Sequence, residues 1–518
     1  MVAGCSSTAP SSPAATTVAT TPAPTGSVSS SISATAGGPR AGGTLRVGAL
    51  GDLQNLEPHI TGLNTDTIYH VWDKLLEYDD KLQPQPRLAE SWDVSSDGKQ
   101  IVLHLRKGVQ WHSGREFTSQ DVAWNFNRIK TDPAVGGTGF PNLVAPLSAA
   151  DTPDANTVVM RAEQPWPGVF NLLSLLNIAD PVSMASPNAK TTVVGTGPFQ
   201  FVEWVQGDHL TLKKNPTYWR SGIPYLDGVI YSLFTDPQAM VTALEAGSID
   251  VADMPPLRDT ARLQKDTQYT VLFNTTTGNK YVLSLQTKQA PTDNKVFRQA
   301  LQYALDRQRI VDTVLLGIGV PSQIPFTPTS PGYDAAKDRF YAFDLDKARA
   351  LVGSSGITNP TLDFNYSTTS AELSRIGQLF QADLAKIGVT LNLKPVEPVA
   401  GSAMLRARSF NGAYASQSIF TQLHPAMFDG NPYYTMQPNN WANFNSPRLT
   451  QLMTGFVTET DPVRAKQYYS DFNDYLLDEA WNIVIATNVP RAIATGKVHD
   501  LRYNMVEMFI QSDAWLSD

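Results

Sequence analysis

The residue types that most often carry catalysis or bind metals follow no catalytic spacing in this 518-residue chain. Its seven histidines form no HxxxH or HExxH pair, the spacing that holds zinc in metalloproteases. The sequence contains no P-loop and no GxGxxG motif after a strand. "SDGK" (Ser96 to Lys99) has the S-x-x-K spacing of a serine acylase, but Asp97-Gly98 between two expected strands predicts a turn. The sequence therefore gives no support to an enzyme, and we expect no catalytic residue, metal or cofactor.

The single cysteine of the chain is Cys5. Val2-Ala3-Gly4-Cys5 resembles the end of a bacterial lipoprotein signal, in which small residues precede a cysteine that is diacylated, although the apolar segment expected before it is absent. Residues 6–39 contain no charged and no aromatic residue, so we expect residues 1–42 to form a disordered tether. We interpret Cys5 as the first residue of the mature protein and as its lipid anchor. The alternatives are an incidental cysteine in a flexible tail and a cytosolic chain.

Composition narrows the class of protein further. A net charge of −8 argues against a nucleic-acid-binding surface, which needs an excess of basic residues. No run approaches the ~18 apolar residues that span a membrane, so we expect attachment to the membrane through the lipid alone. The chain is longer than the ~250–300 residues at which single cores stop growing, which predicts two or more domains.

Strands and helices are expected to alternate along the body of the chain. Thr118 and Asp121 predict a capping box, followed by an apolar helix face. Pro237 and Gly247 predict the start and stop of a second helix, which precedes a strand over 249–251. Further expected elements are strands at 42–50, 101–106 and 389–393 and a helix over 371–388. Such alternation is typical of α/β domains.

Four stretches resemble the family 5 extracellular solute-binding proteins, the peptide- and nickel-type receptors of ABC importers. The stretches are Leu105 to Ile129 ("LRKGVQWHSGREFTSQDVAWNFNRI"), Gly195 to Trp219, Val296 to Phe326 and Phe444 to Met453. Trp111 and Ser113 depart mildly from the family's phenylalanine and aspartate, and the usual acidic residue near Thr450 is missing. The "GTGP" at 195–198 predicts a tight turn that needs the φ freedom of glycine. We expect these motifs to build the scaffold rather than the ligand site.

The resemblance implies an α/β fold with two lobes of the periplasmic-binding-protein type (type II, cluster C) and an extra subdomain. Lobe I would combine residues 43–62, 195–279 and 488–518, the subdomain would take 63–194, and lobe II would take 280–487. Ligand would lie between the lobes, which would close about a hinge near 279 and 488, where "NTTTGNK" (Asn274 to Lys280) offers small residues. The implied protein is a monomeric extracytoplasmic receptor, anchored to the cell membrane by Cys5, that delivers an oligopeptide-like solute to an ABC permease.

The site residues that the resemblance implies lie chiefly in lobe II. Family peptide receptors hold an extended peptide by backbone hydrogen bonds, and an aspartate in a D-x-x-DP-like segment usually pairs with its α-amino group. Here His424-Pro425 takes the place of Asp-Pro, and Asp429 is displaced by several residues. Because an enclosed ammonium group needs an anionic partner, this departure favours a longer or modified peptide or a non-peptide solute. The candidate ligand-binding residues are Tyr414, Gln417, His424, Tyr433, Tyr434, Trp441, Asn443 and His59.

Other functions stay open at this point. Aromatic and amide side chains suit an oligosaccharide as well as a peptide backbone. His59 and His424 could face one another across the cleft and hold a metal complex, although two histidines are few for a metal. An extracytoplasmic enzyme or a surface sensor on the same scaffold is the remaining alternative, and the enzyme would need a converging nucleophile and base that the sequence does not place.

Overall fold

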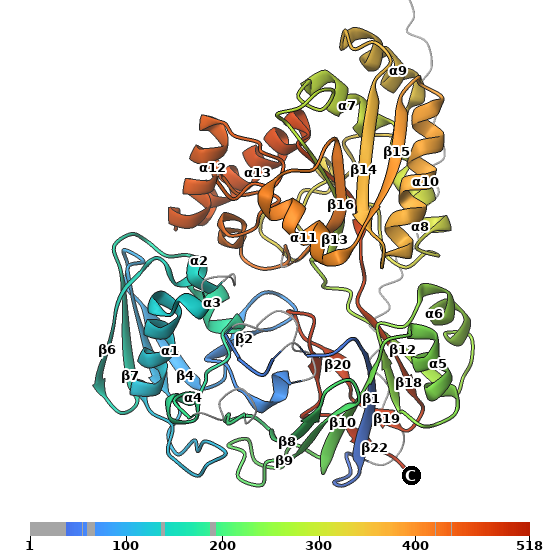
Figure 1. The fold of residues 1–518 in the computed structure, drawn as a ribbon. Coiled ribbons are helices and arrows are strands. Elements are labelled where there is room, and N and C mark those ends of the chain that lie inside the picture. Colours follow the sequence, from blue (N-terminus) through green and yellow to red (C-terminus); the bar gives the residue numbers. More distant parts are fainter. Residues whose placement is uncertain are drawn as a thin grey trace, which may run out of the picture.

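The computed structural model describes residues 38–53, 55–59, 68–135, 140–186, 193–419, 421–436 and 438–518. Cys5 and most of the predicted tether lie outside these residues. Figure 1 shows one upper body and two lower bodies. We call the upper body, built on a five-stranded sheet, lobe II; the lower bodies are lobe I, with a seven-stranded sheet, and the subdomain, with a four-stranded sheet. The α/β, two-lobe architecture is confirmed, whereas the exact residue boundaries of the three parts stay a prediction.

Lobe I is built on a mixed sheet. Its central strand β1 pairs in parallel with β10 and β11, and the outer pairs are antiparallel. The helices α5 (Pro237–Glu245) and α6 (Leu257–Leu263) pack against this sheet. In order across the sheet, the strands are β12 (Tyr269–Phe273), β18 (Arg491–Thr495), β11 (Val251–Asp253), β1 (Thr44–Leu50), β10 (Gly228–Phe234), β9 (His209–Lys214) and β8 (Phe199–Val205).

Two sequence predictions in lobe I need correction. The strand expected over 249–251 spans Val251–Asp253 instead, because the N–H of Ile249 still donates to the Ala243 carbonyl near the end of α5. The glycines of "GTGP" are required for space rather than for φ. A Cβ on Gly195 would lie 1.8 Å from the Val71 carbonyl oxygen, so the neighbouring chain can pass only where no side chain stands.

Lobe II is built on a sheet that is covered on both faces. Alternate residues of the central strand β13 enter different cores: Leu283 joins the cluster with the helices α7 to α10, and Val282 joins the cluster with α12 and α13. Every residue of β13 is buried, as expected of a strand with two covered faces. In order across the sheet, the strands are β15 (Thr390–Val396), β14 (Thr361–Ser367), β16 (Ala413–Ser418), β13 (Lys280–Leu285) and β17 (Asn482–Thr487). The helices are α7 (Lys295–Tyr303), α8 (Arg307–Thr313), α9 (Leu345–Ser354), α10 (Ala371–Ala385), α11 (Pro398–Ala407), α12 (Pro447–Thr458) and α13 (Pro462–Glu479).

The subdomain packs helices against an antiparallel sheet. The predicted capping box at Thr118 is present at the start of α1, whose residues Val122, Phe126 and Ile129 are buried. The "SDGK" stretch is a turn between the first two strands, with Gly98 at φ +66°. The strands, in order, are β4 (Ala89–Val94), β5 (Gln100–Leu105), β7 (Thr157–Ala162) and β6 (Leu147–Asp154). The helices are α1 (Ser119–Thr131), α2 (Phe140–Val144), α3 (Val169–Leu175) and α4 (Pro181–Met184).

The first of the four family-like stretches, Leu105 to Ile129, has a structural role in this subdomain. Trp111 is buried, and its indole N–H donates to Asp121 at 3.2 Å. Asp121 also accepts the backbone N–H of Thr118 at 2.9 Å and forms an ion pair with Arg115 at 2.9 Å. A single carboxylate at the start of α1 thus fixes the loop that precedes the helix.

The polypeptide passes twice between the two large sheets. It leaves lobe I after β12 and enters lobe II at β13, and it returns between β17 and β18. No helix in the described part of the chain is long and apolar enough to cross a bilayer. The remaining short elements are η1 (Tyr69–Val71), η2 (Pro133–Val135), η3 (Lys337–Arg339), η4 (Pro425–Asp429), β2 (Leu76–Tyr78), β3 (Pro84–Pro86), β19 (Val498–His499), β20 (Arg502–Tyr503), β21 (Phe509–Ile510) and β22 (Trp515–Leu516).

Candidate ligand-binding cleft

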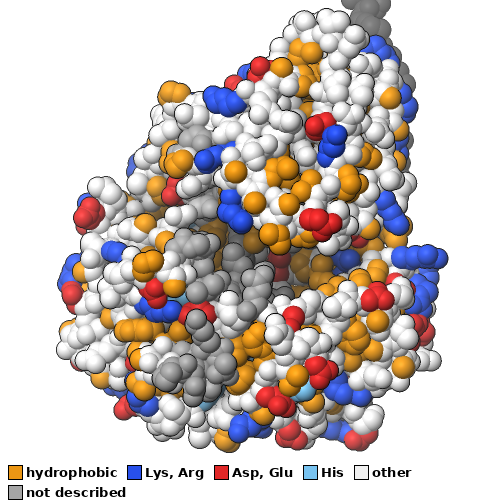
Figure 2. Space-filling view, in the orientation of Figure 1, with side chains coloured by type: hydrophobic (Ala, Val, Ile, Leu, Met, Phe, Trp, Pro, Cys, Tyr) orange, Lys and Arg blue, Asp and Glu red, His pale blue; other side chains and the backbone are white. Residues whose placement is uncertain are grey.

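The surface is hollowed between lobe II and the lower bodies. Figure 2 shows the hollow on one face, with hydrophobic side chains along the lobe II rim above it and along the lobe I rim below it. Strand pairing places the end of β16 on the side of lobe II that faces lobe I, because Ser418 pairs with Lys280, the first residue of β13 after the crossing. The chain that follows β16, where most of the sequence-predicted site residues stand, therefore leaves the sheet at the edge that faces the lower bodies.

Gln417 has the free polar groups expected of a ligand contact. Its side chain is exposed and makes no hydrogen bond with another described residue. Its backbone is fixed, because the hydroxyl of the buried Tyr433 donates to the Gln417 carbonyl at 2.8 Å and lies 2.9 Å from Ser416 Oγ. An amide held in this way can both donate and accept a hydrogen bond, as recognition of a peptide backbone requires.

Tyr414 lies in β16 itself, whereas Trp441 and Asn443 stand on a later loop. Tyr414 is buried against Phe410, and half-buried Trp441 lies edge-on to Tyr433 at a centroid distance of 4.8 Å. Asn443 adopts the left-handed backbone conformation, with φ at +55°, and its amide donates to Gln286 Oε1 at 2.9 Å. These contacts hold the loop that carries Trp441 and Asn443 against the sheet; contact with ligand at these positions stays a prediction.

Tyr434 and His59 have no exposed surface in this arrangement. Tyr434 stacks on Phe428, with centroids 5.0 Å apart, inside the core of lobe II. For His59, Arg128 donates to Nδ1 at 2.9 Å, so the ring proton is on Nε2, which donates to the Asn177 carbonyl at 3.2 Å. Burial lowers the pKa of His59 to about 4, which keeps the ring neutral. Both side chains are therefore buried in this arrangement, and contact of either with ligand stays a prediction. Sequence periodicity cannot distinguish an inward-facing residue from one that faces a cleft.

His424 has a capping role at the start of η4. Its Nδ1 accepts the Ala426 N–H at 3.3 Å, and burial lowers its pKa to about 4. Its backbone makes two hydrogen bonds with the side chain of Asn171 in the subdomain, at 3.0 and 3.2 Å. In the described part of the chain, no three His, Cys, Asp or Glu side chains are grouped so that they could hold a metal ion.

The segment 421–427, which follows β16, joins all three bodies, and sequence analysis did not single it out for this role. Leu423 is buried within the hydrophobic core of the subdomain. The Gln422 amide donates to the Met505 carbonyl at 2.8 Å, and the Thr421 hydroxyl donates to the Gly278 carbonyl at 2.5 Å. Gly278 lies in the predicted hinge "NTTTGNK", where a Cβ would approach Gln422 to 2.0 Å. In the sequence, the one local indication of this contact is Gly278, because its lack of a side chain lets the segment 421–427 pass close to the predicted hinge.

Comparison with known proteins identifies the family of this chain. A family model described as bacterial extracellular solute-binding proteins, family 5 (middle), matches residues 83–444. The chain belongs to this family. This match confirms the resemblance that the sequence motifs indicated. Members of the family are extracytoplasmic binding proteins.

Proteins similar to this chain are named for different solutes. Heme-binding protein A of Haemophilus influenzae is 29% identical over 353 residues, which cover 62% of this chain and 64% of that protein. The dipeptide-binding protein of Escherichia coli is 29% identical over 342 residues, which cover 60% of this chain and 63% of that protein. Each alignment thus spans less than two thirds of the relative. The structure of AgaA from A. tumefaciens R10, in complex with agropinic acid, matches with a TM-score of 0.78 and 25% identity, over 92% of this chain and 99% of that one.

Proposed function

We propose that the protein is the extracytoplasmic substrate-binding receptor of an ABC importer, which captures an oligopeptide-like solute between its lobes and delivers it to the permease. Membership of the family supports this proposal most strongly, because the matched residues 83–444 take in the subdomain sheet and most of lobe II. We place the lobes at the boundaries that the sequence predicts, with the hinge at the crossings near 279 and 488. The work of such a receptor is a difference in solute affinity between open and closed states, and it needs no catalysis.

The peptide assignment rests on the edge of lobe II that faces the cleft. The exposed amide of Gln417, next to the carboxyl end of β16, offers hydrogen bonds of the kind that an extended backbone uses. The dipeptide-binding relative is in keeping with this solute class. The absence of an aspartate between Phe410 and Met427 removes the usual partner of a free α-amino group, so a longer or modified peptide is the preferred solute.

The second candidate is a non-peptide solute on the same scaffold. The names of two relatives favour it: one is a heme-binding protein, and AgaA is in complex with agropinic acid. Half-buried Trp441 and the amides beside it suit a flat or hydroxylated solute as well as a peptide. An oligosaccharide and a metal complex belong to this candidate, and an extracytoplasmic enzyme or a sensor is the remaining alternative.

We further propose that acyl chains on Cys5 anchor the receptor to the cell membrane and that the protein acts as a monomer. The charge-free segment after Cys5 would tether the folded body at a reach of roughly 30 Å, estimated at 5–6 Å times the square root of its length. Such a tether leaves the cleft free to meet the permease.

Thermal-shift measurements with defined peptide pools of two to ten residues test the function. We expect one length class to raise the melting temperature by several degrees, since a ligand at 100 times its Kd adds about 2.7 kcal/mol of stability. A rise with oligosaccharides or heme and none with any peptide pool would overturn the peptide assignment in favour of the second candidate.

A further inference from the structure

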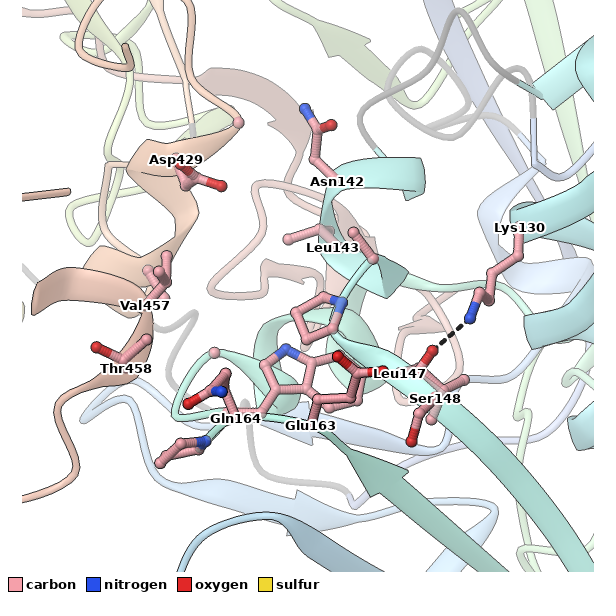
Figure 3. A pocket seen from close by; sticks show the side chains of 17 residues that line it. Lys130, Asn142, Leu143, Leu147, Ser148, Glu163, Gln164, Asp429, Val457 and Thr458 are labelled. Carbon is pink, nitrogen blue, oxygen red and sulfur yellow. Dashed lines mark hydrogen bonds between the residues drawn. The ribbon is translucent and has the colours of Figure 1, made fainter. Parts of the chain in front are cut away.

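A cavity of about 560 Å³ lies between the subdomain and lobe II. Its subdomain wall is formed by the end of α1, the segment around α2 and the loop before α3, and its lobe II wall by η4 and the end of α12 (Figure 3). This volume falls within the ~300–1,000 Å³ of small-molecule sites. The cavity is distinct from the end of β16, because Gln417, Tyr433 and Trp441 are absent from its lining.

The two walls are held at a defined spacing by close contacts beside the cavity. A Cβ on Gly168 would lie 2.7 Å from the Ala426 side chain, so glycine alone permits the subdomain to approach η4 this closely. Gly98 of the subdomain likewise lies close to Thr460 of lobe II, since a Cβ added to Gly98 would lie 3.1 Å from the Thr460 side chain. The cavity is therefore built by two bodies in contact, and it exists only while they keep this arrangement.

The charge on the lobe II wall is uncompensated. Asp429, the last residue of η4, makes no side-chain hydrogen bond or ion pair with another described residue, although it is half-buried. Burial raises the pKa of its carboxyl group. Figure 3 shows Asp429 directed into the cavity, across from Asn142. A partly desolvated carboxylate without a partner is costly, and a bound cation would offset that cost.

The other charges of the lining do not balance Asp429. The amine of Lys130 donates to the Leu147 carbonyl on the far side of the cavity, as Figure 3 shows. Glu163 adds a second carboxylate, but it is exposed. Apolar surface comes from Trp166, Pro146 and other side chains of the lining. The lining thus combines one half-buried carboxylate with an aromatic and aliphatic wall, which complements a cation that has a flat or apolar body.

We propose that this cavity is a second ligand site, which binds a small organic cation, an ammonium or amidinium compound with an apolar body, through Asp429. The site does not depend on the proposed function, because its lining contains none of the residues Gln417, Tyr433 and Trp441, and the peptide assignment rests on the exposed amide of Gln417. A cation bound here contacts both walls, so it stabilises the arrangement in which lobe II rests on the subdomain.

Calorimetric titration with benzamidine and its neutral analogue benzamide tests the proposal on the full chain. We expect benzamidine to bind at least tenfold more tightly than benzamide, and Asp429→Asn to weaken benzamidine at least tenfold while leaving benzamide unchanged. Glu163→Gln, which removes the exposed carboxylate of the same cavity, is the matched control and should change the affinity less than threefold.

A second variant keeps the proposal testable if Asp429→Asn does not fold. Thr458→Trp, placed on the lobe II wall, should occupy part of the cavity and weaken benzamidine binding without altering the charge of Asp429. The proposal is overturned if benzamidine does not bind, if Asp429→Asn and Thr458→Trp bind it as the unmodified chain does, or if benzamide binds equally well.

Discussion

Asn171 is the side chain whose loss should most directly loosen lobe II from the subdomain. It is fully buried in α3, and its amide makes both hydrogen bonds to the His424 backbone. Asn171→Ala removes these bonds and leaves the N–H of His424 without a partner while the bodies stay together; the His424 carbonyl still accepts the N–H of Met427 at 2.9 Å. When the bodies separate, water can satisfy this N–H, so the loss of the two bonds penalises the joined arrangement. The Tyr78 hydroxyl, which donates to Asn171 Oδ1 at 3.2 Å, loses its acceptor in either arrangement, so overall stability falls as well.

The size of the effect follows from the two hydrogen bonds. At about 1 kcal/mol each, their loss disfavours the joined arrangement by about 2 kcal/mol. If capture of solute requires that arrangement, affinity should fall by up to about 30-fold, since 1.4 kcal/mol corresponds to a factor of ten and apparent affinity follows the fraction of molecules in that arrangement. Small-angle scattering without solute should show a larger mean radius of gyration.

The matched control is Asn125→Ala. Asn125 is also fully buried and makes three hydrogen bonds, to Asp121 and Ala179, but none crosses to lobe II. This control should lower the melting temperature without changing solute affinity or the radius of gyration. If Asn171→Ala lowers stability but matches the control in affinity and scattering, the contact has no part in solute capture and the reasoning is refuted.

Three further predictions concern stability, the cleft and the anchor. The pKa of His59 is about 4 in the fold and about 6.5 when unfolded, so the unfolded chain takes up the proton first as the pH falls. The neutral ring therefore contributes about 3 kcal/mol to the free energy of unfolding, a contribution that is complete above pH 6.5 and lost as the pH falls toward 4. His59→Gln should flatten the fall in melting temperature across that range. Gln417→Leu should weaken solute binding about fivefold to tenfold in calorimetry, through one or two lost hydrogen bonds, at an unchanged melting temperature because the side chain is exposed. Cys5→Ser should release the protein from membranes in detergent partitioning and leave solute affinity intact; retention in the detergent phase would contradict lipidation.

Local patterns in the sequence predicted local structure well. The capping box at Thr118 and the apolar face of α1 are present, as are the helix over 371–385 and the strand that follows it. These elements depend on neighbours within a few positions, which periodicity and capping residues report directly. The family motifs predicted the fold because they mark packing within the subdomain and the lobes, as the contacts of Asp121 illustrate.

The arrangement between bodies could not be predicted in this way. Asn171 and His424 are 253 positions apart, and nothing near either residue indicates the other. His59 attracted attention as a histidine near the first lobe, but its ring is held by Arg128, 69 positions away. The cavity beside Asp429 arises only when two bodies with separate cores meet, so its charge could be read from the sequence but its enclosure could not.

Mass spectrometry of the solute released by denaturing the body of the protein, residues 43–518, purified from a bacterial host, tests the central claim most directly. A ladder of co-purified peptides with mixed sequences, centred on lengths above three residues, is the predicted result and would establish both the peptide class and the effect of the missing aspartate. A single non-peptide species, or no retained solute together with no thermal shift from any peptide pool, would contradict the account.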